Sequence, residues 1–324
     1  MKLSTLPADM PEISDAIVSF DPETLARRAV VKETVVREFL SFGNKRAARI
    51  VLAIPEHDGV LDADAVDRIL ITSHCEMQRI SEEFQHGQRV LELLQPLIIT
   101  LRERSAFERP LRIVDIGCGT GYVIRWLAAN APFGKDVELI GADYNVALIE
   151  EARRLANVER LNCSFRVANA FQLAEPASIY LSTGILHHFR GDGLRQFFRQ
   201  HEEPATSAYL HFDFQPTRVA PFGSWLFHAV RMRQSLAKHD GVLSAVRAHS
   251  AQTLLQAAQD GAPGFLSAIY GARFWHLPLP RVFHTLVGIR KRYRDSFIQV
   301  LGSRARRLGA FQNDSHPALS SGDH

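Results

Sequence analysis

The chain has 324 residues, of which 46% are hydrophobic and 23% are charged, so it is long enough for one large domain or two modest ones. Its net charge of +3 is too small to require a nucleic acid or a membrane surface as partner. The three cysteines form neither a disulfide framework nor a zinc motif, the N-terminus lacks a signal-peptide pattern, and no apolar run approaches the ~20 residues of a membrane span. These features predict a soluble cytoplasmic protein with no membrane partner.

Residues 1–105 show helical patterns and no convincing strand, which predicts an N-terminal helical cap or a separate small domain. Asp21 and the proline after it have the form of a helix start, and apolar residues at helical spacing continue to Gly43. Ser73 and Glu76 have the spacing of a capping box and predict the start of a later helix. Further helices are predicted over residues 44–54 and 62–71.

From about residue 110 onward, apolar strand patterns alternate with helical patterns. Such alternation is typical of a parallel sheet covered by helices on both faces, so the predicted fold class is α/β, doubly wound, with a mostly parallel seven-stranded sheet. This core is expected over residues 106–302, with an insert around 215–250 and a flexible tail over 303–324. The strands are predicted over residues 111–116, 137–143, 163–170, 178–183, 207–214, 265–275 and 281–290.

The stretch "RIVDIGCGTGYVIRWLA" combines a strand that ends at Asp115, a glycine-rich turn, and a helix that starts at Tyr122. The turn has glycine at every second position: Gly117, Gly119 and Gly121. Glycine lets the main chain approach a ligand without an intervening Cβ, and the helix start supplies unpaired N–H groups. A dinucleotide-binding turn, G-x-G-x-x-G, would need glycine where Tyr122 stands. The glycines therefore serve a different ligand, or they serve only the packing of the turn.

The pattern D-x-G-x-G-x-G in this stretch resembles the first motif of the class I S-adenosylmethionine-dependent methyltransferases, whose fold is Rossmann-like. The resemblance covers residues 111 to about 215. It implies that S-adenosylmethionine is the cofactor and that its amino-acid end lies in the turn, against Asp115, Cys118 and the three glycines. It also implies that the chain is an enzyme that transfers a methyl group.

The ends of the later strands add features that fit the same family. Asp143 ends the second strand, where the family has an acidic group on the ribose hydroxyls, although Asp is also an ordinary cap for the helix that follows. The resemblance places Tyr144 beside it. The third strand ends in Asn169 and Ala170, where the family often has an acidic residue on the adenine amino group. In "STGILHHF", after the fourth strand, Thr183 is expected at the edge of the cofactor.

The chemistry of the cofactor limits what the protein must supply. Its methyl carbon is electrophilic, so alignment of the acceptor supplies much of the catalysis, and a general base is needed only for a protonated acceptor. The candidates for a base are His187, after the fourth strand, and His211, in the fifth, and each has an alternative role in capping or packing. No metal is expected, because the adjacent His74 and Cys75 have no second pair of ligands nearby.

The additions to the core point to a small-molecule acceptor, which the N-terminal helices and the insert would enclose. Basic stretches at 290–295 and 303–307 leave RNA as an alternative acceptor, and a protein acceptor or a non-catalytic cofactor-binding subunit stays open as well. The sequence lacks the motifs used for methylating DNA bases. The aromatic residues proposed as pocket walls are Phe222, Trp225, Phe227, Phe274 and Trp275.

Overall fold

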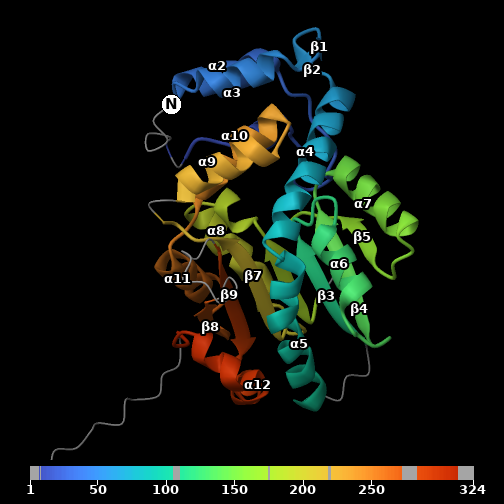
Figure 1. Cartoon of the computed structure of the whole chain (residues 1–324), viewed down its shortest axis with the longest axis vertical. Coiled ribbons are helices and arrows are strands. Elements are labelled where there is room, and N and C mark those ends of the chain that lie inside the picture. The colour runs from blue at the N-terminus through green and yellow to red at the C-terminus, as the bar shows by residue number, and fades with distance from the viewer. Residues whose placement is uncertain are drawn as a thin grey trace, which may run out of the picture.

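The computed structural model describes residues 7, 9–104, 110–173, 176–217, 220–271 and 283–312, and its centre is a seven-stranded sheet (Figure 1). The strand order is β5-β4-β3-β6-β7-β9-β8, with parallel pairing from β5 to β7 and antiparallel pairing on both sides of β9. The predicted doubly wound, mostly parallel sheet is confirmed. The strands are β3 (Leu111–Ile116), β4 (Val137–Asp143), β5 (Ser164–Val167), β6 (Ile179–Thr183), β7 (Ala208–Phe214), β8 (Phe265–Tyr270) and β9 (Phe283–Arg290).

Helices cover both faces of this sheet, which is why its strands are almost continuously apolar. One face packs against α5 (His86–Arg104), α6 (Tyr122–Asn130), α7 (Val146–Val158) and α12 (Arg294–Leu301). The other face packs against α8 (Asp192–Arg199) and α11 (Ala251–Gly261). Ser250 caps α11 by accepting a hydrogen bond from the N–H of Thr253, which fixes where this helix begins.

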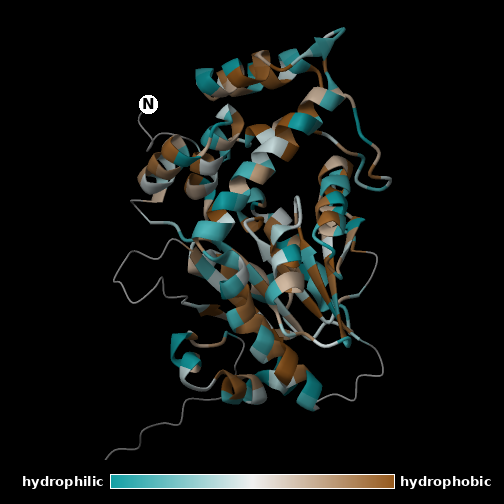
Figure 2. Cartoon of the chain, turned by 45° about the vertical axis from the view of Figure 1, so that its right-hand side comes forward, coloured by the Kyte–Doolittle hydropathy of each residue, from teal (hydrophilic) through white to brown (hydrophobic). Residues whose placement is uncertain are grey.

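The N-terminal helices and the insert form one layer above the carboxyl ends of the parallel strands (Figure 1). The N-terminal elements are α1 (Ile13–Ala16), α2 (Lys32–Ser41), α3 (Lys45–Leu52), a short hairpin of β1 (Glu56–His57) and β2 (Val60–Leu61), and α4 (Ala63–Glu83). The insert contributes α9 (Ala220–Arg231) and α10 (Ser235–Arg247). Leu236 and Leu243 of α10 lie in the same apolar cluster as Phe39 and Val66, so the two additions share a core. In Figure 2 hydrophobic (brown) and hydrophilic (teal) residues alternate along the long ribbons of α4 and α5.

Two of the predicted N-terminal helix starts are wrong. Asp21 accepts hydrogen bonds from the N–H groups of Glu23 and Thr24 and so closes a turn, and Leu25 then takes a left-handed φ of 57°. The helix begins only at Lys32. Ser73 starts no helix either, because α4 runs through it and buries its side chain.

The ends of the core domain also differ from the predicted boundaries. Helix α5 precedes residue 106, yet its apolar side chains belong to the core of the sheet. At the other end, η5 (Gly302–Arg307) follows α12, and Leu308 and Gln312 form β-bridges to Tyr270 and Ser267. The first part of the expected flexible tail is therefore ordered along β8, and residues 313–324 lie outside the described residues. Within the described part of the chain, no helix is long and apolar enough to cross a membrane.

The glycine that starts α6 provides a test of this packing. Gly121 has a φ of 75°, and a Cβ at this position would collide with the ring of Phe165. We expect Gly121→Ala to lower the free energy of unfolding by about 1–2 kcal/mol for the left-handed backbone and about 1–3 kcal/mol more for overpacking. Gly43→Ala is the matched control, because Gly43 has a φ of 71° and open space around it. Urea denaturation compares the two, and equal losses would contradict the packing argument.

Candidate active site

A cavity of about 380 Å³ lies at the carboxyl ends of β3, β4 and β6, beneath the layer formed by the N-terminal helices and the insert. Open α/β sheets bind ligands at this edge, and the volume lies in the usual range for a ligand pocket. The wall nearest the sheet comes from the strand ends, and the opposite wall comes from α1, α4 and α10. The polar groups that line it include Glu12, Asp15, His74, Asp143, Asn169, Thr183, His187, His188 and Asp240.

The glycine-rich turn forms part of the cavity wall, but its three glycines have different environments. Gly117 and Gly119 line the cavity, with φ values of 70° and 54°. A Cβ on Gly119 would lie 2.7 Å from the His74 ring, and a Cβ on Gly117 would meet Ile185. Gly121 is not among the lining residues, and a Cβ at this position would meet the ring of Phe165. Cys118 lines the cavity beside these glycines, and burial raises the pKa of its thiol well above the usual value.

Asp115 lies behind the turn and does not line the cavity, in contrast to the predicted direct contact. Its side chain is buried, and its Oδ1 has no hydrogen-bond partner among the described residues. Burial, and then the charge of Asp143, raise the pKa of this carboxyl well above its ordinary value. A buried carboxyl oxygen without a partner is costly, so it favours an arrangement in which a bound molecule or water satisfies it.

Asp143 sits at the end of β4 and faces the cavity. Its Oδ2 accepts a hydrogen bond of 3.0 Å from the N–H of Gly119, and its Oδ1 accepts one of 2.9 Å from the N–H of Asn145. The cap of α7 is Asn145, not Asp143, because the Asn145 side chain accepts the N–H groups of Ala147 and Leu148. The alternative role of Asp143 as the helix cap is therefore wrong, and its carboxylate ties the glycine turn to the second strand.

His74 of α4 is a cavity residue for which the sequence predicted no role. Its Nδ1 lies 2.9 Å from the carbonyl oxygen of Leu70, so the ring donates there and turns its other edge toward Gly119. Burial lowers the pKa of His74, so the ring is neutral at pH 7. No local pattern distinguishes this histidine, because its place depends on how α4 crosses the sheet edge.

The remaining predicted cofactor residues, Tyr144, Asn169, Ala170 and Thr183, all line the cavity. Asn169 donates from Nδ2 to the carbonyl oxygen of Pro22 and accepts the N–H of Phe171, so its amide is already oriented. The Tyr144 ring packs edge-on against Phe20, with 5.1 Å between ring centroids. The N-terminal segment therefore contacts two of the predicted cofactor positions.

His187 lies in η2 (Leu186–His188), at the cavity, and is held by Asp213. Its Nδ1 is 2.9 Å from Oδ1 of Asp213, whose other oxygen accepts the N–H of His187. Its Nε2 is 3.5 Å from Oε1 of Glu12. Burial opposes protonation, but Asp213 and Glu12 raise the pKa of His187 to about 10. With this environment His187 is protonated at neutral pH, which argues against its predicted role as a general base.

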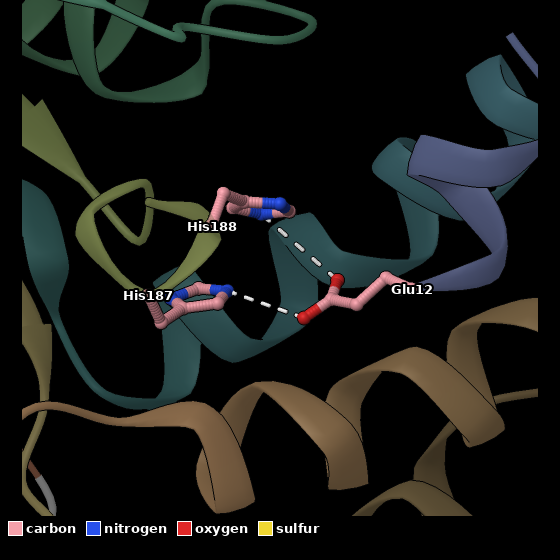
Figure 3. A group of neighbouring side chains, drawn as sticks. All are labelled: Glu12, His187 and His188. Carbon is pink, nitrogen blue, oxygen red and sulfur yellow. Dashed lines mark ion pairs between the residues drawn. The ribbon is translucent and has the colours of Figure 1, made fainter. Parts of the chain in front are cut away.

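Figure 3 shows Glu12 reaching from the N-terminal segment toward both His187 and His188. The Nδ1 of His188 lies 3.0 Å from Oδ2 of Asp15, and its Nε2 lies 3.9 Å from Oε2 of Glu12. Burial disfavours the charged carboxylate, but His188 and His187 lower the pKa of Glu12 to about 2. Arg247 completes the group 3.5 Å from Asp15.

His211 is not among the residues that line the cavity, so the geometry gives its predicted catalytic role no support. Its Nδ1 is 2.9 Å from Oγ of Ser182, and its Nε2 is 2.8 Å from Nε2 of His201. The ring is buried among Phe197, Phe198 and other aromatic side chains on the α8 face of the sheet. Burial, and then His201, lower the pKa of His211 well below its ordinary value, which is typical of a neutral core histidine.

The expected pocket walls are also revised. Phe222 and Trp225 are exposed on α9, Phe227 packs against Phe84, and Phe274 and Trp275 lie outside the described residues. The aromatic part of the cavity wall instead comes from strand ends and turns: Tyr122, Phe171, Phe189, Phe212, Phe214 and Phe283. The frequency of aromatic residues in a stretch of sequence does not distinguish cavity-lining from other aromatic residues, because it does not show which side chains face the edge of the sheet.

Comparison with known proteins places the matching segment across this site. Residues 113–203 match the family model described as a methyltransferase domain. The chain is 35% identical over 104 residues to trans-aconitate 2-methyltransferase of Pseudomonas aeruginosa strain UCBPP-PA14, which covers 31% of this chain and 35% of that protein. It is 23% identical over 164 residues to malonyl-[acyl-carrier protein] O-methyltransferase of Bacillus anthracis, which covers 46% of this chain and 59% of that protein. The match spans about a third of the length of the Pseudomonas relatives.

Solved structures with a similar core were also found. The plantazolicin methyltransferase BamL with bound SAH has a TM-score of 0.46 at 14% identity, over 69% of this chain and 97% of that one. Magnesium protoporphyrin IX methyltransferase of Synechocystis PCC 6803 with bound SAH has a TM-score of 0.41 at 16% identity, over 80% of this chain and 99% of that one.

The sequence match and the order of the sheet identify the class of domain at the site. Residues 113–203 form a methyltransferase domain, and this segment is similar to class I S-adenosylmethionine-dependent methyltransferases. S-adenosylmethionine is the cofactor of this family, and the residues present fit it: Gly117 and Gly119 keep the turn free of side chains, and Asp143 supplies a carboxylate beside them. The unpaired oxygen of Asp115 is consistent with a ligand or water at the same edge.

The packing of α9 on α10 closes the cavity from above and provides a second test. Ser224 of α9 donates to the carbonyl oxygen of Gly241, and a Cβ at Gly241 would collide with the ring of His228. We expect Gly241→Ala to loosen α9 by about 1–3 kcal/mol, so that limited proteolysis within α9 becomes about tenfold faster. Gly223→Ala is the control, because a Cβ there meets open space. Equal cleavage of the two variants would contradict this packing.

Proposed function

We propose that the protein transfers the methyl group of S-adenosylmethionine to a small-molecule acceptor held in the cavity. The observation that carries this proposal is the enclosure of the site. The cavity joins the glycine turn and Asp143 to a second wall made by α1, α4 and α10. A site covered in this way suits a compact acceptor and excludes water during transfer.

Each part of the cavity has a role in this proposal. The turn at Gly117 and Gly119 holds the amino-acid end of the cofactor, and Asp143 accepts hydrogen bonds from its ribose hydroxyls. Asn169 and Ala170 lie along the adenine, and Thr183 lies at the edge of the methionine part. The bound cofactor supplies an electrophilic methyl carbon. The protein contributes mainly the alignment of the acceptor with that carbon.

The residues that line the cavity include both polar and aromatic side chains. The polar ones include His187, His188, Glu12 and Asp15, and the aromatic ones include Phe212, Phe214 and Phe283. This arrangement suits an acceptor with a polar reacting group on a flat or apolar body. Its identity does not follow from the trans-aconitate methyltransferases, because the match to them covers only about a third of their length.

The basic C-terminal residues give less support to an RNA acceptor. Arg290 pairs with Glu202, and Arg304 and Arg307 bind the carbonyl and carboxylate oxygens of Glu92. These arginines therefore stabilise the fold, and they lie near α12, at the end of the molecule away from the insert (Figure 1). An RNA bound at the cavity would therefore need positively charged side chains other than these arginines to contact its phosphates.

The proposed reaction is tested by incubating the purified protein with S-adenosylmethionine carrying a deuterated methyl group and fractionated small-molecule extracts. We expect a product with a labelled methyl group, detected by mass spectrometry, together with S-adenosylhomocysteine. If methyl transfer occurs only when RNA or a protein is added, the small-molecule proposal is wrong. If the protein binds the cofactor but methyl transfer requires a second protein chain, this chain is a non-catalytic subunit.

The proposed role of Asp143 makes a separate prediction. Removal of its carboxylate in Asp143→Ala should weaken S-adenosylmethionine binding about 10–100-fold, because hydrogen bonds to a charged group each contribute about 1.5–3 kcal/mol. Isothermal titration calorimetry measures the change. Asp136→Ala is the control, since Asp136 precedes β4 at its other end and pairs with Arg102 on the surface. Unchanged affinity in folded Asp143→Ala would exclude the ribose role.

A further inference from the structure

The turn after β6 and the N-terminal segment bring two histidines and a carboxylate together at the cavity wall. Glu12, His187 and His188 each offer one ligand atom, and these atoms all lie within 4.8 Å of one another. Figure 3 shows the carboxylate of Glu12 in front of both rings. Two imidazoles and one carboxylate form a common set of ligands for a divalent transition metal, with positions left open for other ligands.

The second ring nitrogen of each histidine has a carboxylate partner. Asp213 accepts from Nδ1 of His187, and Asp15 accepts from Nδ1 of His188. With a proton on Nδ1, loss of the proton from Nε2 leaves a lone pair on Nε2 that points toward Glu12. Histidines that bind metals usually donate their other N–H to a carboxylate or carbonyl, which fixes the tautomer and raises the basicity of the ligand. The same outer arrangement occurs here on both rings.

The distances also suit an ion. A tetrahedral ion with bonds of about 2.0–2.2 Å separates its ligand atoms by roughly 3.3–3.5 Å. The Nε2 atom of His187 is 3.5 Å from Oε1 of Glu12, and the Nε2 atom of His188 is 3.9 Å from Oε2. The ligand atoms of the two histidines lie within 4.8 Å of each other, and the side chain of His188 is about a quarter exposed, so it has room to move toward a shared ion.

The charge of the surroundings favours a cation. Glu12, Asp15 and Asp213 place three carboxylates around the two rings, whereas the cations beside them are Arg247, 3.5 Å from Asp15, and Arg190, which interacts electrostatically with Asp213. With neutral imidazoles the group therefore has an excess of negative charge in a buried place. A divalent ion neutralises this excess and displaces the protons that the rings otherwise hold.

We propose that Nε2 of His187, Nε2 of His188 and the Glu12 carboxylate form a binding site for a divalent transition metal such as Zn²⁺. All three residues line the cavity, so the open positions of the ion face the acceptor. An acceptor oxygen bound there loses its proton more readily, and no protein base is then required. This last consequence rests on the proposed methyl transfer, whereas the metal site itself does not.

The test uses the full-length protein, freed of metals with a chelator and titrated with Co²⁺ in the absence of cofactor and acceptor. We expect saturable binding of one ion, with visible d–d absorption that Zn²⁺ abolishes. His188→Gln and Glu12→Gln should lose this absorption. Asp15→Asn should weaken binding about 10–100-fold, because Asp15 orients His188 without reaching the ion.

His57→Gln is the matched control, because His57 is an exposed histidine 3.2 Å from a carboxylate oxygen of Asp62, and this variant should bind as the wild type does. No cobalt absorption in the wild-type protein, or equal binding in folded His188→Gln, would overturn the proposal and leave an ion-pair cluster. Should the variants unfold in thermal scans, wild-type crystals soaked in Co²⁺ decide the matter by anomalous diffraction. A peak bonded to both Nε2 atoms supports the site, and its absence overturns it. Failure of methyl transfer with intact cobalt binding would contradict only the proposed function.

Discussion

The buried carboxylate of Asp240 holds the site together. It lies on α10 and accepts hydrogen bonds from the N–H groups of Ile13 and Ser14, at distances of 2.9 and 2.8 Å. A carboxylate at the start of a helix is favourably placed, because the first N–H groups have no partners within the helix. This contact fixes α1 against the insert, and α1 then carries Glu12 and Asp15 to the two histidines. Without it, the cavity would lose the part of its outer wall that α1 forms, together with Glu12 and Asp15.

Much of the fold followed from sequence because strand and helix patterns in the core are local. The strands β3 and β4 have the predicted bounds, and β5, β6 and β7 differ from them by at most three residues at either end. The predicted end of the strand at 265–275 and the predicted start of the strand at 281–290 lie outside the described residues. Asp143, Asn169 and Thr183 could be placed at one edge because the carboxyl ends of parallel strands meet there. His211 was predicted as a candidate base because it lies near the end of a strand. Alternation of residues shows which face of the strand a side chain is on, but not whether that face meets a cavity or a helix.

The other half of the site could not be predicted, because it depends on contacts between distant parts of the chain. Glu12, His74 and Asp240 come from three separate parts of the chain, and no local pattern marks any of them as a cavity residue. Ser73 shows the same limit in the fold, since its capping-box spacing was overridden by the burial of α4. The two sides of the cavity therefore differ in origin: one is encoded by the order of the strands, and the other by the packing of the additions.

The shared core of the N-terminal helices and α10 has a consequence for biosynthesis. Phe39 and Val66 pack in one cluster with Leu236 and Leu243, so partners in that cluster are separated by most of the core domain. During translation the first helices leave the ribosome well before these leucines exist. Their apolar faces therefore stay exposed, or are bound by a chaperone, until the insert that covers them has been synthesised. Folding of the N-terminal helices is thus coupled to synthesis of the central sheet. A chain truncated before the insert would leave the apolar faces of these helices exposed and prone to aggregation.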